Sequence, residues 1–170
     1  SCSWRGGGAG SGAVAACASA LDAAKSVTAT FVTRPDLVAT AVTNPPGAAL
    51  PGARFSVTAT VKNQGLASAG SSTARYYLSL DGVKDAGDLL LSGSRRVASL
   101  AAGASSTGTV TVTIPSSTAL GTYFLLACAD DTKVVAESDE GNNCRVSLSA
   151  VQVTRPDLVV TAVKKRLWTA

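Results

Sequence analysis

The sequence contains no histidine and no methionine, and its first residue is Ser1. Without histidine, neither a Ser-His-Asp nor a Cys-His catalytic arrangement can form, and the commonest general base and metal ligand is missing. Aromatic residues make up only 5% of the chain, which leaves few rings to stack on nucleic-acid bases. We therefore predict that the chain is not an enzyme, and we expect it to be a piece of a longer protein.

The chain also lacks long apolar runs and a concentrated basic surface. No stretch supplies the roughly 18 to 20 predominantly apolar residues of a membrane-spanning helix, so we expect no membrane insertion. The formal net charge is +4, yet residues 36–153 carry eight Lys/Arg and nine Asp/Glu. The basic excess is scattered over the flanks, which predicts no nucleic-acid binding.

Apolar and polar residues alternate with a period of two through most of the chain. In "RFSVTATVKN" at 54–63 every second residue is apolar, as in a strand with one face on a core. Further strands are expected at 36–42, 74–80, 88–91, 96–100, 107–114, 122–129 and 144–153. Turn-forming sequences such as "NPPG" at 44–47 and "EGNN" at 140–143 separate them. The pattern predicts an all-β fold, an immunoglobulin-like antiparallel β-sandwich of about seven to eight strands.

A ten-residue sequence occurs twice, as "TRPDLVATAV" at 33–42 and "TRPDLVVTAV" at 154–163. The two copies agree at nine of ten positions and start 121 residues apart, which is about the length of one domain. We therefore expect one domain at 33–153 and the truncated start of a second, similar domain at 154–170.

Residues 1–32 differ in composition from the rest. Gly, Ala and Ser dominate up to residue 20, and only one clear strand pattern follows. Such a segment cannot form a core of its own, so we expect it to be the end of a preceding module. Cys2 and Cys17 are candidates for a disulfide across the Gly-rich stretch.

Cys128 and Cys144 fall in consecutive expected strands. We predict a cross-strand disulfide between them, and two free buried thiols are the alternative. By alternation, Cys144 shares a face with Val146, Leu148 and Ala150, and we expect that apolar face to lie on the core. Such a disulfide would indicate an oxidising, extracytoplasmic location.

Two groups of carboxylates could carry chemistry. Asp81, Asp85 and Asp88 in "DGVKDAGD" offer oxygen ligands for a calcium ion, although Lys84 lies among them and the spacing is not that of an EF-hand loop. A plain polar turn is the alternative, and no other cofactor is expected.

The second group precedes Cys144 and consists of Asp130, Asp131, Glu137, Asp139 and Glu140. A hydrolytic pair would need a cleft that raises the pKa of one carboxyl group. The alternative is a solvated turn in which these side chains bond to local backbone groups.

Tyr76 and Tyr77 are neighbours in one expected strand, so their rings point to opposite faces and at most one of them is exposed. We therefore expect no aromatic platform for a sugar.

Residues 35–153 contain five segments in this order: "PDLV", "GARFSVTATVKNQGLASAG", "YYLSLDG", "GTYFLLACAD" and "VVAESDEGNNC". The segments and their order resemble the CARDB domain, the cell-adhesion-related domain found in bacteria. The resemblance implies an immunoglobulin-like sandwich, often in tandem, in secreted or surface proteins of bacteria and archaea. It also implies a structural turn signature made of Glu137, Asp139, Glu140, Asn142 and Asn143. Residues 11–31, "SGAVAACASALDAAKSVTATF", resemble the end of a bacterial internalin B-type surface repeat.

These features predict a non-catalytic, extracellular adhesion or spacer module of a repetitive bacterial surface or secreted protein. The alternative is a carbohydrate- or calcium-binding accessory domain of a secreted hydrolase. The expected partners are an extracellular protein or glycan and the neighbouring tandem domains of the same chain.

Overall fold

The computed structural model describes residues 33–157, which contain eight β-strands and no helix. The strands are β1 (Leu37–Val42), β2 (Ala48–Ala49), β3 (Arg54–Asn63), β4 (Ser72–Ser79), β5 (Leu89–Val97), β6 (Ser105–Thr113), β7 (Gly121–Cys128) and β8 (Cys144–Val153). Cys2, Cys17 and the module expected at 1–32 lie outside the described residues, as does most of the module expected at 154–170.

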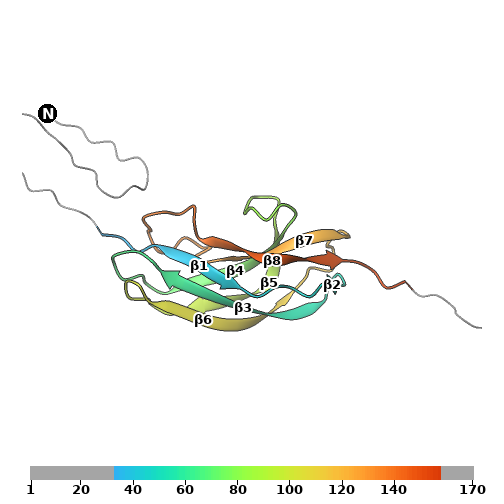
Figure 1. Cartoon of the computed structure of the whole chain (residues 1–170), viewed down its shortest axis with the longest axis horizontal. Helices are drawn as coiled ribbons and strands as arrows, with labels where there is room; N and C mark the ends of the chain where they lie inside the picture. Colours follow the sequence, from blue (N-terminus) through green and yellow to red (C-terminus); the bar gives the residue numbers. More distant parts are fainter. Residues whose placement is uncertain (1–32, 158–170) are drawn as a thin grey trace, which may run out of the picture. The chain divides into compact units, whose positions relative to one another are not determined.

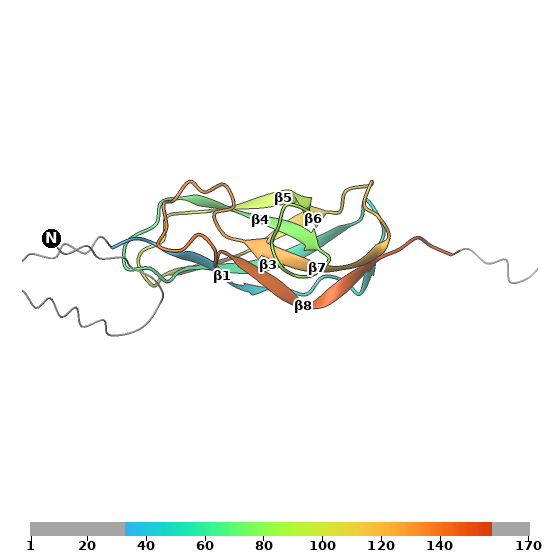
Figure 2. The ribbon, with the colours of Figure 1, turned by 90° about the horizontal axis from the view of Figure 1, so that it is seen from above.

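The strands form two layers. In one layer β1, β3 and β6 pair antiparallel, and in the other β5, β4, β7 and β8 pair antiparallel, with the short β2 added parallel to the end of β8. A single pairing between Ser92 of β5 and Thr113 of β6 joins the layers. Figure 1 shows β3 and β6 along one side and β7 and β8 along the other, and Figure 2 shows the same domain from above. The predicted all-β, immunoglobulin-like sandwich is confirmed.

The core lies between the two layers, where alternate residues of each strand point inward. The main cluster includes Val57, Ala59, Tyr76, Leu78, Leu91, Val112, Ile114, Leu125, Ala127, Val151 and Val153. Threonines occupy the outward positions of β3 and β6, and their hydroxyls pair across the strands, Thr58 with Thr109 at 2.7 Å and Thr60 with Thr107 at 2.8 Å. The period-two pattern therefore separates a buried apolar face from a hydroxyl-rich outer face.

We expected separate strands at 88–91 and 96–100, but residues 89–91 and 96–97 belong to one strand, β5, and residues 98–100 lie beyond its end. Gly93 lies between the two expected strands with a φ of +111°, a conformation that residues with a side chain rarely adopt. A Cβ atom at this position would lie 2.6 Å from the carbonyl oxygen of Thr111 in β6. Glycine thus allows β5 to continue through its polar centre while it passes from β4 towards β6.

The described chain enters and leaves the sandwich at opposite ends (Figure 1). At the entry, the backbone N–H of Leu66 in the β3–β4 connection donates to the carbonyl oxygen of Arg34. At the exit, the N–H of Thr154 donates to the carbonyl oxygen of Ala49 in β2. These contacts attach both connecting segments to the ends of the domain.

Candidate functional site

The β4–β5 loop, residues 80–88, covers part of the outer face of the second layer. Beneath it Tyr77 and Leu126 point outward from the sheet but are nevertheless buried. The Nζ atom of Lys84 lies 4.1 Å from the centre of the Tyr77 ring, a cation–π contact. Tyr76 points the other way into the main core, so neither tyrosine is exposed.

Tyr77 connects this covered face to the connection between β7 and β8. Its hydroxyl donates to Oδ2 of Asp131 at 2.6 Å, and the same oxygen lies 3.6 Å from Nη1 of Arg75. Burial, together with the hydrogen bond to the Asp131 carboxylate, raises the pKa of Tyr77 to about 12. Tyr77 therefore stays protonated near neutral pH and serves as a hydrogen-bond donor.

A disulfide joins Cys128 of β7 to Cys144 of β8, the two cysteines expected to pair. They lie directly opposite each other in the antiparallel ladder, with their Cα atoms 4.0 Å apart. The expected position of Cys144 on the main core is wrong, however. The disulfide packs with Tyr77 and Leu126 on the outer face of the layer, in a small cluster separate from the core.

The face of β8 that carries Cys144 lies outward along the strand. Val151 and Val153 fill the core from the opposite face, while Val146 and Leu148, expected to be buried, are exposed. Local alternation could not identify the buried face, because the cover over Cys144 comes from the β4–β5 loop, about 60 residues earlier in the sequence.

A bulge in the middle of β8 contributes to this exposure. Phe124 of β7 pairs with Ala150 of β8, and Leu126 pairs with Val146. Two residues of β7 therefore lie opposite four residues of β8. The side-chain Oδ1 of Asn44 accepts the N–H groups of Leu148 and Ser149, and the hydroxyl of Ser147 accepts the N–H of Leu125. The bulged backbone is therefore hydrogen-bonded although Leu148 points to solvent.

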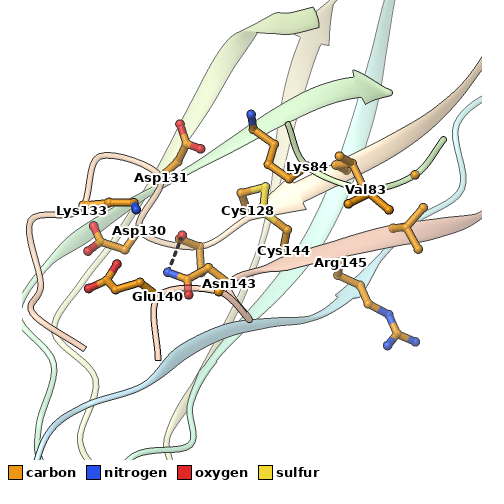
Figure 3. A pocket seen from close by; sticks show the side chains of 15 residues that line it. Val83, Lys84, Cys128, Asp130, Asp131, Lys133, Glu140, Asn143, Cys144 and Arg145 are labelled. Atoms are coloured by element: carbon orange, nitrogen blue, oxygen red, sulfur yellow. Dashed lines mark hydrogen bonds between the residues drawn. A yellow bond between two sulfur atoms is a disulfide. The ribbon is translucent and has the colours of Figure 1, made fainter. Parts of the chain in front are cut away.

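An open depression of about 610 Å³ lies beside the disulfide, between the β4–β5 loop and the β7–β8 connection (Figure 3). Its walls carry charges of both signs, from Lys84, Lys133 and Arg145 and from Asp130, Asp131 and Glu140. Because its lining carries charged side chains of both signs, the depression has no single electrostatic preference for an anion or a cation.

Glu137 links the β7–β8 connection to the beginning of β1. One carboxylate oxygen accepts the backbone N–H of Leu37 at 2.5 Å, and the other accepts Nδ2–H of Asn143 at 3.3 Å. Burial raises the pKa of Glu137 to about 7, and the nearby carboxylates of Glu140, Asp130 and Asp36 add to this, while the N–H of Leu37 acts against it. Because only 4% of Glu137 is exposed, its carboxyl group cannot reach a substrate as a general acid.

The other members of the expected turn signature also form hydrogen bonds. Asp139 accepts the N–H of Gly141, Glu140 accepts the N–H of Glu137, Asn142 donates to Asp36, and Asn143 donates to the carbonyl oxygen of Ala129. The sequence singled out these residues through the family resemblance. No local signal indicated that two of their partners, Asp36 and Leu37, lie about 100 residues away.

The three aspartates considered for calcium do not converge on one point. Asp81 accepts the N–H of Val83, Asp85 accepts the N–H of Gly87, and Asp88 accepts the N–H of Asp85. Each carboxylate therefore closes its own turn. In residues 33–157 no three His, Cys, Asp or Glu side chains are grouped in a way that could hold a metal ion.

Asp130 differs from these aspartates because it is completely buried. Its Oδ2 accepts the N–H of Val135 at 2.8 Å, whereas its Oδ1 has no hydrogen-bond partner. The sequence grouped Asp130 with the other carboxylates before Cys144, and no local pattern distinguished it from Asp131.

The comparisons with known proteins agree with the expected family. The CARDB family model matches residues 34–147, more than half of the chain. It does not reach residues 1–32, and the expected internalin-like repeat there finds no support. A comparison with curated proteins gives no match.

In residues 33–157 there is no helix of the length and apolarity required to cross a membrane.

Among solved structures, the chain is similar to a CARDB domain from Pyrococcus furiosus that was crystallised in complex with di-metal ions. It is 25% identical with a TM-score of 0.49, covering 73% of this chain and 97% of that one. A domain of a candidate cell surface protein from Methanosarcina acetivorans is 24% identical with a TM-score of 0.48, covering 72% of this chain and 95% of that one.

A Listeria innocua β-glucosidase in complex with laminaribiose is 17% identical with a TM-score of 0.43, covering 74% of this chain but only 17% of the enzyme. The assignment to a family rests on the family-model match and not on these structures. The match over residues 34–147 shows that the chain belongs to the CARDB family.

Proposed function

We propose that this domain is a non-catalytic, extracellular spacer module in a repetitive bacterial surface or secreted protein. CARDB is a cell-surface-associated domain family. The observation that carries the proposal is the position of the first and last described residues, 33 and 157, at opposite ends of the sandwich (Figure 1). Because the exit segment at 154–163 repeats the entry segment at 33–42, successive modules would extend the protein in one direction.

The disulfide supports an extracellular role. A disulfide between neighbouring strands lowers the conformational entropy of the unfolded chain, and it persists in oxidising compartments. Cys128 and Cys144 are 16 residues apart, so the bridge also excludes the β7–β8 connection from any extension of the chain under load. A module of this kind would resist stretching and proteolysis.

The exposed chemistry of the domain supports a spacer more than a carbohydrate-binding accessory domain. None of the five aromatic residues in the described part of the chain, Phe55, Tyr76, Tyr77, Tyr123 and Phe124, is exposed. Flat exposed rings are the usual means of holding a sugar ring, since they supply a large contact area at little entropic cost. The outward threonine hydroxyls of β3 and β6 pair with one another and present no cluster of charge.

Single-molecule stretching of the full chain from its two ends would test the mechanical role. We expect one cooperative unfolding step for residues 33–157 under oxidising conditions. Reduction should lengthen that step by roughly 50 Å, from about 3.5 Å for each residue released between the cysteines. Gradual extension without a cooperative step would contradict the proposal.

Binding of the full chain to arrays of glycans and extracellular-matrix proteins would separate the spacer from an adhesin. We expect no saturable binding with either calcium or a chelator present. Saturable binding to one glycan or protein would instead support the adhesion role, and a loss of that binding on chelation would support the accessory-domain alternative.

A further inference from the structure

The repeated decapeptide lies at both ends of this domain, so each residue at the entry end has a counterpart at the exit end. Arg34 in the first copy corresponds to Arg155 in the second. The carbonyl oxygen of Arg34 accepts the backbone N–H of Leu66 at 3.1 Å, and Leu66 is 79% exposed. The entry end of the domain therefore presents a leucine side chain to solvent directly beside the arginine of the repeat.

The exit end also presents leucine side chains to solvent, beside Ser116, Ser117 and Thr118. Leu50 and Leu120 are 45% and 53% exposed and line an open depression of about 490 Å³. Pro51, Arg155 and Pro156 line the same depression. Arg155, the counterpart of Arg34, is thus already seated against the exposed leucines of the exit end.

The connection between successive modules is short. β8 ends at Val153, and Leu158 is the counterpart of Leu37, the first residue of β1. Only residues 154–157 lie between them, and they can span at most about 18 Å even when fully extended. Pro156 restricts the connection further. Two folded modules joined in this way must lie with their ends close together.

We propose that the following module packs end to end on this one, with its counterpart of Leu66 against Leu50 and Leu120. In that module the amide of the Leu66 counterpart would donate to the carbonyl oxygen of Arg155, as Leu66 does to Arg34 here. The side chain of that leucine then lies beside the depression that Arg155 lines. Burial of the three leucines favours a fixed angle between modules. The inference rests on the proposed function, because it requires that residue 154 begins a second module.

A two-module protein would test the contact. The full chain up to Val163 is continued with the chain's own residues 43–157, so that a complete second copy follows the natural connection. Cys2 and Cys17 are replaced by serine, and a spin label is attached at Thr111→Cys in each copy, on the exposed outer face of β6. Pulsed electron paramagnetic resonance then measures the distribution of distances between the two labels.

We expect one narrow distance distribution in the parent protein. Leu66→Asp in the second copy, or Leu120→Asp in the first, should broaden it by at least twofold, because a buried carboxylate would separate the ends. Leu148→Asp in the first copy is the matched control, since Leu148 is an exposed leucine on the outer face of β8 and should leave the distribution unchanged.

Two results would overturn the inference, and they have different meanings. If both copies fold but the parent distribution is as broad as that of the aspartate variants, the modules move independently, and the spacer proposal survives as a flexible chain of domains. If circular dichroism and thermal unfolding show that the second copy does not fold, the tandem arrangement itself is wrong and the end-to-end contact fails with it.

Discussion

The backbone N–H of Leu37 donates a hydrogen bond to the side-chain carboxylate of Glu137, 100 residues further along the chain. Leu37 begins β1, and Glu137 lies in the connection that leads into β8. This bond attaches the first strand of one layer to the last turn of the other. The ionisation state of the Glu137 carboxyl group should therefore affect how strongly β1 is held against the β7–β8 connection.

The stability of the protein should therefore depend on the protonation of Glu137. Its pKa is raised from 4.5 to about 7 by burial, so the folded chain binds this proton more tightly than the unfolded chain does. The contribution to stability is complete below about pH 4.5 and is lost as the pH rises through about 7. We expect this group to lower the free energy of unfolding by about 1–3 kcal/mol between pH 5 and pH 8.

Chemical denaturation of the full chain at several pH values would measure this dependence. Glu137→Gln cannot ionise and should flatten the profile, while Asp85→Asn, at an exposed position of the β4–β5 loop, should leave it unchanged. An equal slope in the parent and the Glu137→Gln variant would show that Glu137 does not control the pH dependence.

Removal of the disulfide should destabilise the domain without abolishing its fold. The bridge closes a segment with a sequence separation of 16 and lies outside the main core. The loop-closure model gives a loss of about 3 kcal/mol for such a segment. The double variant Cys128→Ala/Cys144→Ala should match the reduced parent in urea denaturation and should not respond to a reducing agent. A parent protein of unchanged stability under reduction would contradict this expectation.

Substitution of Gly93 should be far more costly than substitution of a glycine in open space. In Gly93→Ala the new Cβ atom would meet the carbonyl oxygen of Thr111 in a backbone conformation that alanine rarely adopts. We expect a loss of about 2 kcal/mol or more. Gly70→Ala is the control, because no atom lies within 4 Å of its added Cβ, and a change below about 0.5 kcal/mol is expected. Equal effects in thermal unfolding would refute the role given to Gly93 in β5.

Calcium should not change the melting temperature through Asp81, Asp85 and Asp88, because each of these carboxylates closes its own turn. Differential scanning calorimetry of the full chain with calcium and with a chelator tests this. If calcium raises the melting temperature, Asp85→Asn and Asp130→Asn locate the effect. Sensitivity to Asp85→Asn would return the site to the β4–β5 loop, whereas sensitivity to Asp130→Asn would place it at the unpartnered buried oxygen of Asp130.

The strands were largely predictable from local sequence because their pattern is local. Alternation in β3 directly reflects one buried and one exposed face, and the same reasoning located β6, β7 and β8 to within two residues. The two-residue β2 was not predicted, since such a short segment has no periodicity and exists only by pairing with β8. The expected strands 88–91 and 96–100 left out the polar centre of β5 at 92–95, because this centre interrupts the apolar pattern, whereas pairing with β4 keeps it extended.

The candidate site was less predictable because its residues meet across long sequence distances. Cys128 and Cys144 could be paired from their positions in consecutive strands, but the face on which they lie depends on the β4–β5 loop. Glu137 and Asn142 stood out through resemblance to a family, while their attachment to Leu37 and Asp36 follows from the folding of β1 beside the last turn.

The amino-acid sequence by itself determined the all-β class, the domain length between the repeated decapeptides, and the cysteine pair. Each of these follows from residues that are neighbours or occupy a repeating pattern. Only the tertiary structure decided which apolar face is buried in β8, which carboxylate becomes hard to ionise, and that residues 33 and 157 lie at opposite ends of the sandwich. Burial and proximity arise when distant strands come together, and no local pattern records which surface another part of the chain will cover.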